Sequence, residues 1–399
     1  MFRLLFLCLL LPSCTSRMGY RQSPEKTIES HGARVSLAHV EIDDQGELTS
    51  REQLKRVTDH IRASSKEPLL LVVYLHGWNR NSSSSKISGG GDLINFRKWL
   101  KEVNEADSGR RTMGVFVSWR GRSLSTFPVG VDYFHRHAAA RRMGGVVGTE
   151  VLHEIGATAR AANSKSRIVM MGHSMGGAIL ESSFSESIAS RVAMRHAEGK
   201  KIRRSDFPVE LIVTINSAES AIHARQLVST FKSRGIRDIE GGPLMVSITS
   251  QDDIATGFAF PLGNILGRWV LPFNVFNTSV SGMYRERQPP DALQGTQAAA
   301  HRTAVGHFQP LFSHGYRVQA EQERTLTQVM ADNRNARRGS GFVVHGTQAS
   351  FVFEPPKEEY YNDTPYWIVP VPGAIMKNHE DIWNDSFVGM VVALMSLTN

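Results

Sequence analysis

From residue 168 the chain reads Ile168-Val169-Met170-Met171-Gly172-His173-Ser174-Met175-Gly176-Gly177, and this segment is the most informative about its architecture. The four apolar residues at its start predict a buried strand, and the residues from Gly177 to Ile188 predict a helix. Between the two, Ser174 is the centre of a G-x-S-x-G pattern. Gly172 and Gly176 flank a turn so sharp that a Cβ at either position would collide with a neighbouring element. The serine hydroxyl is therefore expected to project above the sheet edge, near the positive end of the helix dipole.

Further apolar runs predict strands that are buried on both faces, as in a parallel sheet. Including the run before Ser174, they span residues 69–75, 115–117, 168–171, 211–215, 244–248 and 367–371. Helical spacing separates them, for example in residues 131–162 and 181–197. Ser50 is placed to cap a helix that runs to Ile61, with Gln53 three residues after the cap. Alternating strands and helices predict an α/β fold, with a mostly parallel central sheet flanked by helices.

Two parts of the chain depart from this alternation. Residues 35–42 alternate apolar and polar side chains and end at the turn-forming Asp43-Asp44-Gln45-Gly46, which predicts a β-hairpin at the start of the fold. Residues 257–360 form a long insertion before the last strand, and we expect a cap-like unit there. Its apolar first part, residues 258–276, is expected to pack in the core or to cover an apolar pocket.

The N-terminal residues have the features of an export signal. Met1-Phe2-Arg3 is followed by an apolar run, residues 4–11, that is too short to span a bilayer. The segment that ends at Cys14 resembles the lipobox of bacterial lipoproteins, in which the cysteine is lipidated; a cleaved secretory leader is the alternative. We expect an exported protein, lipid-anchored in the cell envelope at Cys14 or else periplasmic or secreted. The predicted units are a leader at 1–14, a polar tether at 15–33 and a folded domain at 34–399.

Composition narrows the classes of function. Cys8 and Cys14 are the only cysteines, so the predicted mature domain has no disulfide and no thiol nucleophile. The net charge of +8 is spread along the chain without interleaved aromatic residues, which argues against a nucleic-acid partner. No histidine or cysteine cluster has metal-ligand spacing, and we expect neither a metal nor an organic cofactor. The oligomeric state is left open.

A second motif follows the apolar run at residues 69–75. There the chain reads Tyr74-Leu75-His76-Gly77-Trp78, which is similar to the H-G-x oxyanion motif of lipases and esterases. Gly77 would let the backbone turn close to a substrate. Together with Gly172-His173-Ser174-Met175-Gly176, this motif makes the chain from Leu69 to the C-terminus resemble the serine hydrolases of the α/β-hydrolase superfamily.

The resemblance implies a nucleophile, an acid and a histidine, in that order along the chain and each after a strand. Ser174 would be the nucleophile. The acid would follow the fifth strand, where two adjacent aspartates stand in Gln251-Asp252-Asp253-Ile254. Asp253 has the offset from the strand that this superfamily uses, and Asp252 is the alternative. Asp253 could instead cap a helical turn that begins at Ala255.

The histidine would follow the last strand, which places His379 in that role. A closing helix is expected to begin at Asn384 or Asp385. His314 is the second candidate for the catalytic base. The other histidines of the insertion that compete are His301 and His307. A lone histidine can also be purely structural.

The resemblance further implies that the backbone N–H groups of Met175 and Trp78 bind the oxyanion. The expected activity is hydrolysis of carboxylic esters, of small molecules or lipids, through an acyl-enzyme. An acyltransferase or thioesterase would use the same residues. A non-catalytic, surface-anchored binding protein on the same fold is the alternative from another class.

Overall fold

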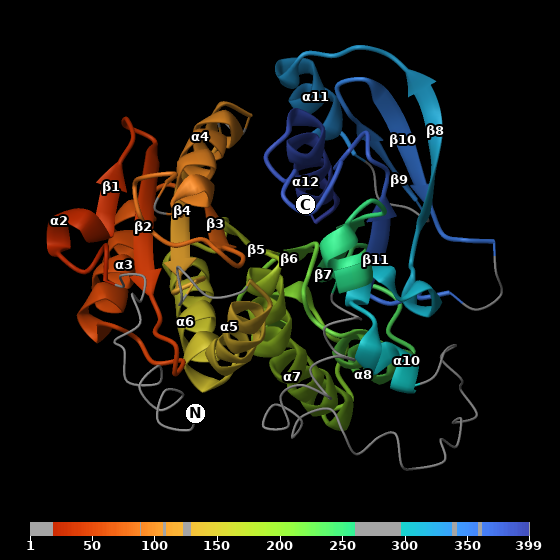
Figure 1. The fold of residues 1–399 in the computed structure, drawn as a ribbon, viewed down its shortest axis with the longest axis horizontal. Helices are drawn as coiled ribbons and strands as arrows, with labels where there is room; N and C mark the ends of the chain where they lie inside the picture. The colour runs from red at the N-terminus through yellow and green to blue at the C-terminus, as the bar shows by residue number, and fades with distance from the viewer. Residues whose placement is uncertain are drawn as a thin grey trace, which may run out of the picture.

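The structure, a computed structural model, describes residues 19–87, 89–106, 109–122, 129–259, 297–336, 341–357 and 361–398. It has an α/β fold built on a mixed sheet of eight strands in the order β1-β2-β4-β3-β5-β6-β7-β11 (Figure 1). β1 is antiparallel to β2, and every other neighbouring pair is parallel. The strands are β1 (Ile28–Ser30), β2 (Val35–Glu41), β3 (Leu69–Leu75), β4 (Arg111–Ser118), β5 (Arg167–His173), β6 (Leu211–Ile215), β7 (Met245–Ser250) and β11 (Tyr366–Val371).

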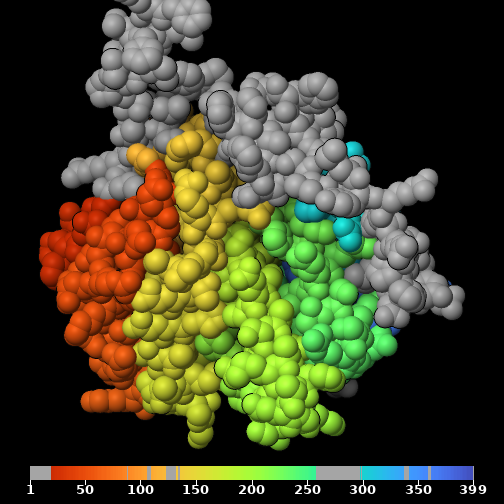
Figure 2. All heavy atoms as spheres, turned by 90° about the horizontal axis from the view of Figure 1, so that it is seen from below, coloured from red at the N-terminus to blue at the C-terminus, as the bar shows by residue number. Residues whose placement is uncertain are grey.

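Helices cover both faces of the sheet, and each face has its own apolar core. One core contains residues of α3 (Arg51–Ser64), α6 (Val146–Ala162), α7 (Met175–Ala197), α8 (Ala221–Lys232) and α10 (Gln297–Arg302). The other contains residues of α4 (Gly91–Ala106), α11 (Leu326–Asn333) and α12 (Asp385–Leu397). α5 (Val129–Met143) packs against α7. Figure 2 shows α3, α6, α7 and α8 side by side across the first face.

The apolar runs become the central strands because helices exclude water from both of their faces. Every residue of β3 and β5 is buried, as expected for strands without a polar face. Ser50 caps α3 by accepting a hydrogen bond from the backbone N–H of Gln53. The helical region predicted at residues 131–162 is divided into α5 and α6 at Gly144-Gly145. Within the described part of the chain, no helix is long and apolar enough to cross a membrane.

The N-terminal region differs from the expected hairpin and tether. β2 finds its antiparallel partner in β1, which precedes it, whereas the residues after the turn make only an isolated bridge between Ile42 and Leu48. Part of the expected tether is therefore folded, as α2 (Pro24–Thr27) and β1. Glu29 holds this edge in place, since its carboxylate accepts hydrogen bonds from Arg21 and from Arg97 of α4.

The described part of the insertion has two components. A three-stranded antiparallel sheet is made of β8 (Gly315–Glu321), β10 (Ala349–Glu354) and β9 (Phe342–His345), in that order, and α12 packs against β9. Before it, η4 (Val305–His307) and η5 (Gln309–Leu311) lie beside the main sheet. There a Cβ on Gly306 would overlap the side chain of Thr249 at the end of β7. The predicted leader with Cys14, and residues 260–276 of the apolar segment, lie outside the described residues.

The glycines of the G-x-S-x-G segment give a test of the packing. A Cβ on Gly176 would overlap the backbone carbonyl of Leu75 in β3, so Gly176→Ala should lower the free energy of unfolding by about 3 kcal/mol. Gly91, at the start of α4, has open space around its Cβ position, so Gly91→Ala should leave stability unchanged or slightly raised. Urea unfolding of both variants measures the difference. Equal stabilities would contradict the close approach of β3 and α7.

Candidate active site

Ser174 joins β5 to α7 in a strained backbone conformation. Its φ is +54° and its ψ is −116°, a combination that costs free energy for a residue with a Cβ. Its N–H donates to the carbonyl of Ile215, and its own carbonyl accepts from the N–H of Ala218, so the turn is fixed to the end of β6. The residue is only 5% exposed. Among the described residues its hydroxyl makes no hydrogen bond, so none joins Ser174 to His379 in this structure.

Asp253 and His379 meet although they are far apart in the sequence. The Nδ1 of His379 lies 2.9 Å from the Oδ2 of Asp253, and the aspartate side chain is fully buried. Because a carboxylate only accepts, Nδ1 carries the proton that it donates, and in the neutral tautomer of this kind Nε2 is the acceptor nitrogen. The ring of His379 also lies 4.9 Å, between centroids, from the ring of His173, the residue before Ser174. The structure thus brings the predicted acid and histidine to the turn that carries the serine.

The Asp253 carboxylate is surrounded by further donors. Its Oδ1 accepts from the N–H groups of Ala255 and Thr256, so Asp253 also caps the short helical turn η2 (Ala255–Ala259). The Thr256 hydroxyl donates to Oδ2, and it lies 3.0 Å from the Nε2 of His307. Burial opposes ionisation of Asp253, but the hydrogen bonds from His379 and Thr256 outweigh it and keep its pKa below the usual value. The carboxylate is therefore ionised at neutral pH.

The alternative residues occupy other positions. His314 is buried against the rings of Trp367 and Phe342, and burial lowers its pKa to about 3. His307 lies behind Thr256 and reaches Asp253 only through that hydroxyl. Asp252 makes no ion pair with a histidine in the described structure, and its backbone N–H donates to the hydroxyl of Ser250. His301 lies on α10 and has an interaction partner of its own.

The loop after β3 is held by His76. Its imidazole is fully buried: Nε2 accepts from the backbone N–H of Trp119, and Nδ1 donates to the carbonyl of Gly77. Burial lowers the His76 pKa to about 4, so the ring is neutral. Gly77 lies so close to Ser174 that a Cβ there would be 3.0 Å from the Cβ of Ser174. The N–H groups of Trp78 and Met175 donate to no acceptor among the described residues, so both are available to an oxyanion.

The loop that carries His379 is attached to the ends of β5, β6 and β7. His173 Nε2 donates to the carbonyl of His379 at 2.7 Å, and Asn216 Nδ2 donates to the same oxygen at 3.0 Å. The hydroxyl of Ser250 donates to the carbonyl of Met376. The sequence analysis did not predict these contacts. The only available signal was that His173, Asn216 and Ser250 are polar residues at the carboxyl ends of strands, where an α/β site forms.

One cluster has the composition of a metal site. Ligand atoms of His173, His379 and Glu380 lie within 4.8 Å of one another. Each residue already has a partner, however, since His173 and His379 make the bonds described above and Glu380 forms an ion pair with Arg80. We therefore interpret the cluster as an anchor of the histidine loop. The Nδ1 of His173 is buried and has no hydrogen-bond partner in the described structure.

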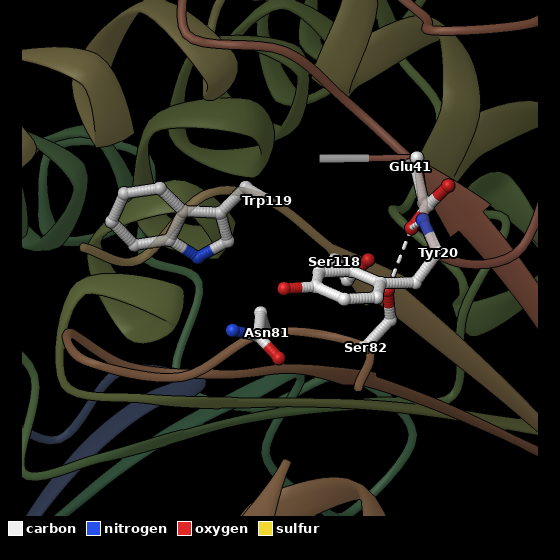
Figure 3. A pocket seen from close by; sticks show the side chains of 7 residues that line it. Tyr20, Glu41, Asn81, Ser82, Ser118 and Trp119 are labelled. Atoms are coloured by element: carbon white, nitrogen blue, oxygen red, sulfur yellow. Dashed lines mark hydrogen bonds between the residues drawn. The ribbon is translucent and has the colours of Figure 1, made fainter. Parts of the chain in front are cut away.

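A small pocket lies elsewhere, between the N-terminal residues and the loop after β3 (Figure 3). It is lined by Gly19, Tyr20, Glu41, Asn81, Ser82, Ser118 and Trp119. The Oε1 of Glu41 accepts from the Ser82 hydroxyl and the backbone N–H of Tyr20, and its Oε2 accepts from the backbone N–H of Arg21, so both oxygens already have donors. None of the three candidate catalytic residues lines this pocket.

Comparisons with known proteins do not assign this chain to a family. No family model matches the chain, and no curated protein was found to be similar to it. The functional interpretation therefore depends on the residues and their geometry.

The two buried histidines make a prediction about protonation. Burial favours the neutral imidazole, and it lowers the pKa to about 4 for His76 and to about 3 for His314. Neither ring should take up a proton between pH 8 and pH 5, so neither can act as a general base that becomes a cation near neutral pH. A titration followed by NMR, with His76→Gln and His314→Phe used for assignment, checks this. A midpoint above pH 5 for either ring would contradict it.

Proposed function

We propose that the protein is a serine hydrolase of the α/β-hydrolase type that cleaves carboxylic esters of small molecules or lipids. One observation carries the proposal: the 2.9 Å hydrogen bond between His379 and Asp253, formed beside the strained turn of Ser174. The strand order and the described part of the insertion are compatible with this superfamily. The leader-like N-terminus supports an exported enzyme, with Cys14 as the proposed site of a lipid anchor.

In the proposed reaction, Ser174 Oγ attacks the acyl carbon while His379 Nε2 takes the hydroxyl proton. Asp253 holds the imidazole in the tautomer with Nδ1 protonated and stabilises the imidazolium that forms. The imidazolium then gives its proton to the leaving alkoxide, and an acyl-enzyme remains. A water molecule, deprotonated by His379, releases the acid and restores Ser174. Each proton transfer uses the same nitrogen, so the other nitrogen can stay bonded to Asp253.

The N–H groups of Met175 and Trp78 are the proposed oxyanion donors. Met175 is the first residue of α7, where backbone N–H groups have no partner within the helix and the dipole is positive. Trp78 is fixed from the other side, because its indole N–H donates to Asp132. Such preorganised donors need no reorientation as charge develops, and each contributes about 3 kcal/mol in comparable hydrolases.

An acyltransferase or a thioesterase would use the same residues with another acceptor or leaving group. Nothing in the described residues favours either over hydrolysis. The ionised Asp253 and its bonded histidine favour a reactive site over a non-catalytic binding protein, since such a binding protein has no need of a buried charge.

Replacing the nucleophile tests the proposal directly. Wild-type protein should hydrolyse p-nitrophenyl esters and be labelled by a fluorophosphonate, whereas Ser174→Ala should lose both activities. Ser190→Ala, at an exposed position of α7, serves as the control and should remain active. Absence of hydrolysis and of labelling in the folded wild-type protein would contradict a serine mechanism and support the binding-protein alternative.

The assignment of the acid has its own test. Asp253→Asn should lower kcat by about 10⁴-fold, because the amide favours the wrong imidazole tautomer. Asp252→Asn should change kcat by less than about threefold, because its carboxylate does not contact His379 in the described structure. Ester hydrolysis by the two variants, measured under saturating substrate, gives the comparison. The reverse ranking would assign the role to Asp252.

A further inference from the structure

We infer that Asn216 is a positioning residue, which fixes the catalytic histidine by holding its backbone carbonyl. The inference rests on the proposed function and extends it to a residue that contacts neither substrate nor the reacting atoms. Asn216 directly follows β6, the strand next to the one that carries Ser174. It is completely buried.

Both the oxygen and the nitrogen of the Asn216 side-chain amide make hydrogen bonds. Its Oδ1 accepts from the backbone N–H of Ser250, at the end of β7, at 3.0 Å. Its Nδ2 donates to the carbonyls of His379 at 3.0 Å and Asn378 at 3.3 Å. The orientation of the amide follows from these partners, because the reverse orientation would face its oxygen toward two carbonyl oxygens. The side chain of Asn216 therefore connects β7, the strand that precedes Asp253, to the loop that carries His379.

The backbone of Asn216 is adapted to this role. Its φ is +45°, in the left-handed region that asparagine and glycine tolerate better than other residues. The N–H of Asn216 donates to the carbonyl of Ile248 in β7, which fixes the residue to the same strand as its side chain does. Asn216 is thus fixed to β7 through both its backbone N–H and its side-chain oxygen, while its Nδ2 donates to the histidine loop.

The carbonyl of His379 has a second donor in His173. The Nε2–H of His173 lies 2.7 Å from that oxygen, so the strand that carries the nucleophile also holds the base. Burial lowers the His173 pKa, so this donor is a neutral imidazole. With two donors on one carbonyl, the His379 backbone has little freedom to move. The imidazole is fixed at its other end by Asp253.

Loss of the hydrogen bonds from Asn216 should lower kcat more than it weakens substrate binding. An imidazole displaced by about 1 Å costs roughly 10²-fold in rate, because Nε2 no longer lines up with the serine hydroxyl. Asn216→Gly should therefore lower kcat by about 10- to 100-fold with KM within about twofold, since glycine accepts φ +45° without strain. Asn216→Asp keeps the shape and the acceptor for Ser250, but it places an oxygen against two carbonyls. Its kcat should fall at least as far.

Glu240→Gly is the matched control. Glu240 also has a positive φ, of 54°, and its side chain also accepts a bond from a backbone N–H, that of Arg204. It precedes the amino end of β7, whereas Asp253 follows the carboxyl end. This variant should retain the wild-type kcat. Circular dichroism and thermal unfolding of all three variants show whether each one is folded.

A second readout does not depend on turnover. The proton between His379 and Asp253 gives a low-field ¹H NMR signal, which should persist in Ser174→Ala and Glu240→Gly and be shifted or broadened in both Asn216 variants. An unchanged signal together with an unchanged kcat in folded Asn216→Asp would overturn the inference. If the wild-type protein is inert toward esters and probe, the proposed function fails, while an Asn216-dependent signal would still support the positioning of His379.

Discussion

The close contact of β3, β5 and α7 is the constraint from which the candidate site follows. Residues 172 and 176 have backbone atoms where a Cβ would lie, so the chain can turn there only as glycine. This contact forces Ser174 into its left-handed conformation and brings the Gly77 loop against it. The N–H of Ser174 is then aligned with the end of β6. The positions of the neighbouring loops therefore depend on this turn.

Around that turn, the site is built mainly of hydrogen bonds between strand ends. The carbonyl of His379 accepts from residues at the ends of β5 and β6, and the carboxylate of Asp253 accepts from η2 and from the ring of His379. In a buried region such bonds are stronger than in water, and an unpartnered polar group is costly. This explains how the buried Asp253 can remain ionised. Substrate would enter a site whose polar groups are already oriented.

The sequence was sufficient for the elements whose signals are local. The runs at 69–75 and 211–215 match β3 and β6 residue for residue, and the cap at Ser50 is where its side chain predicts it. The pairing of Asp253 with His379 was predictable only through the family resemblance, because their separation along the chain carries no signal. Asn216 and His173 were missed since their roles depend on tertiary contacts. β1 was missed because it is short and is stabilised by ion pairs with distant arginines.

The contact of η4 with β7 distinguishes a segment of the insertion that is fixed to the main sheet. Gly306 fits against Thr249, the N–H of Val305 donates to Glu219, and Ser313 exchanges hydrogen bonds with Ile368 in β11. Residues 305–313 therefore belong structurally to the sheet, although they lie within the insertion by sequence. Substitutions within residues 305–313 should therefore disturb the main sheet more than substitutions in exposed parts of the insertion. A design that replaces the rest of the insertion should therefore keep residues 305–313 in place.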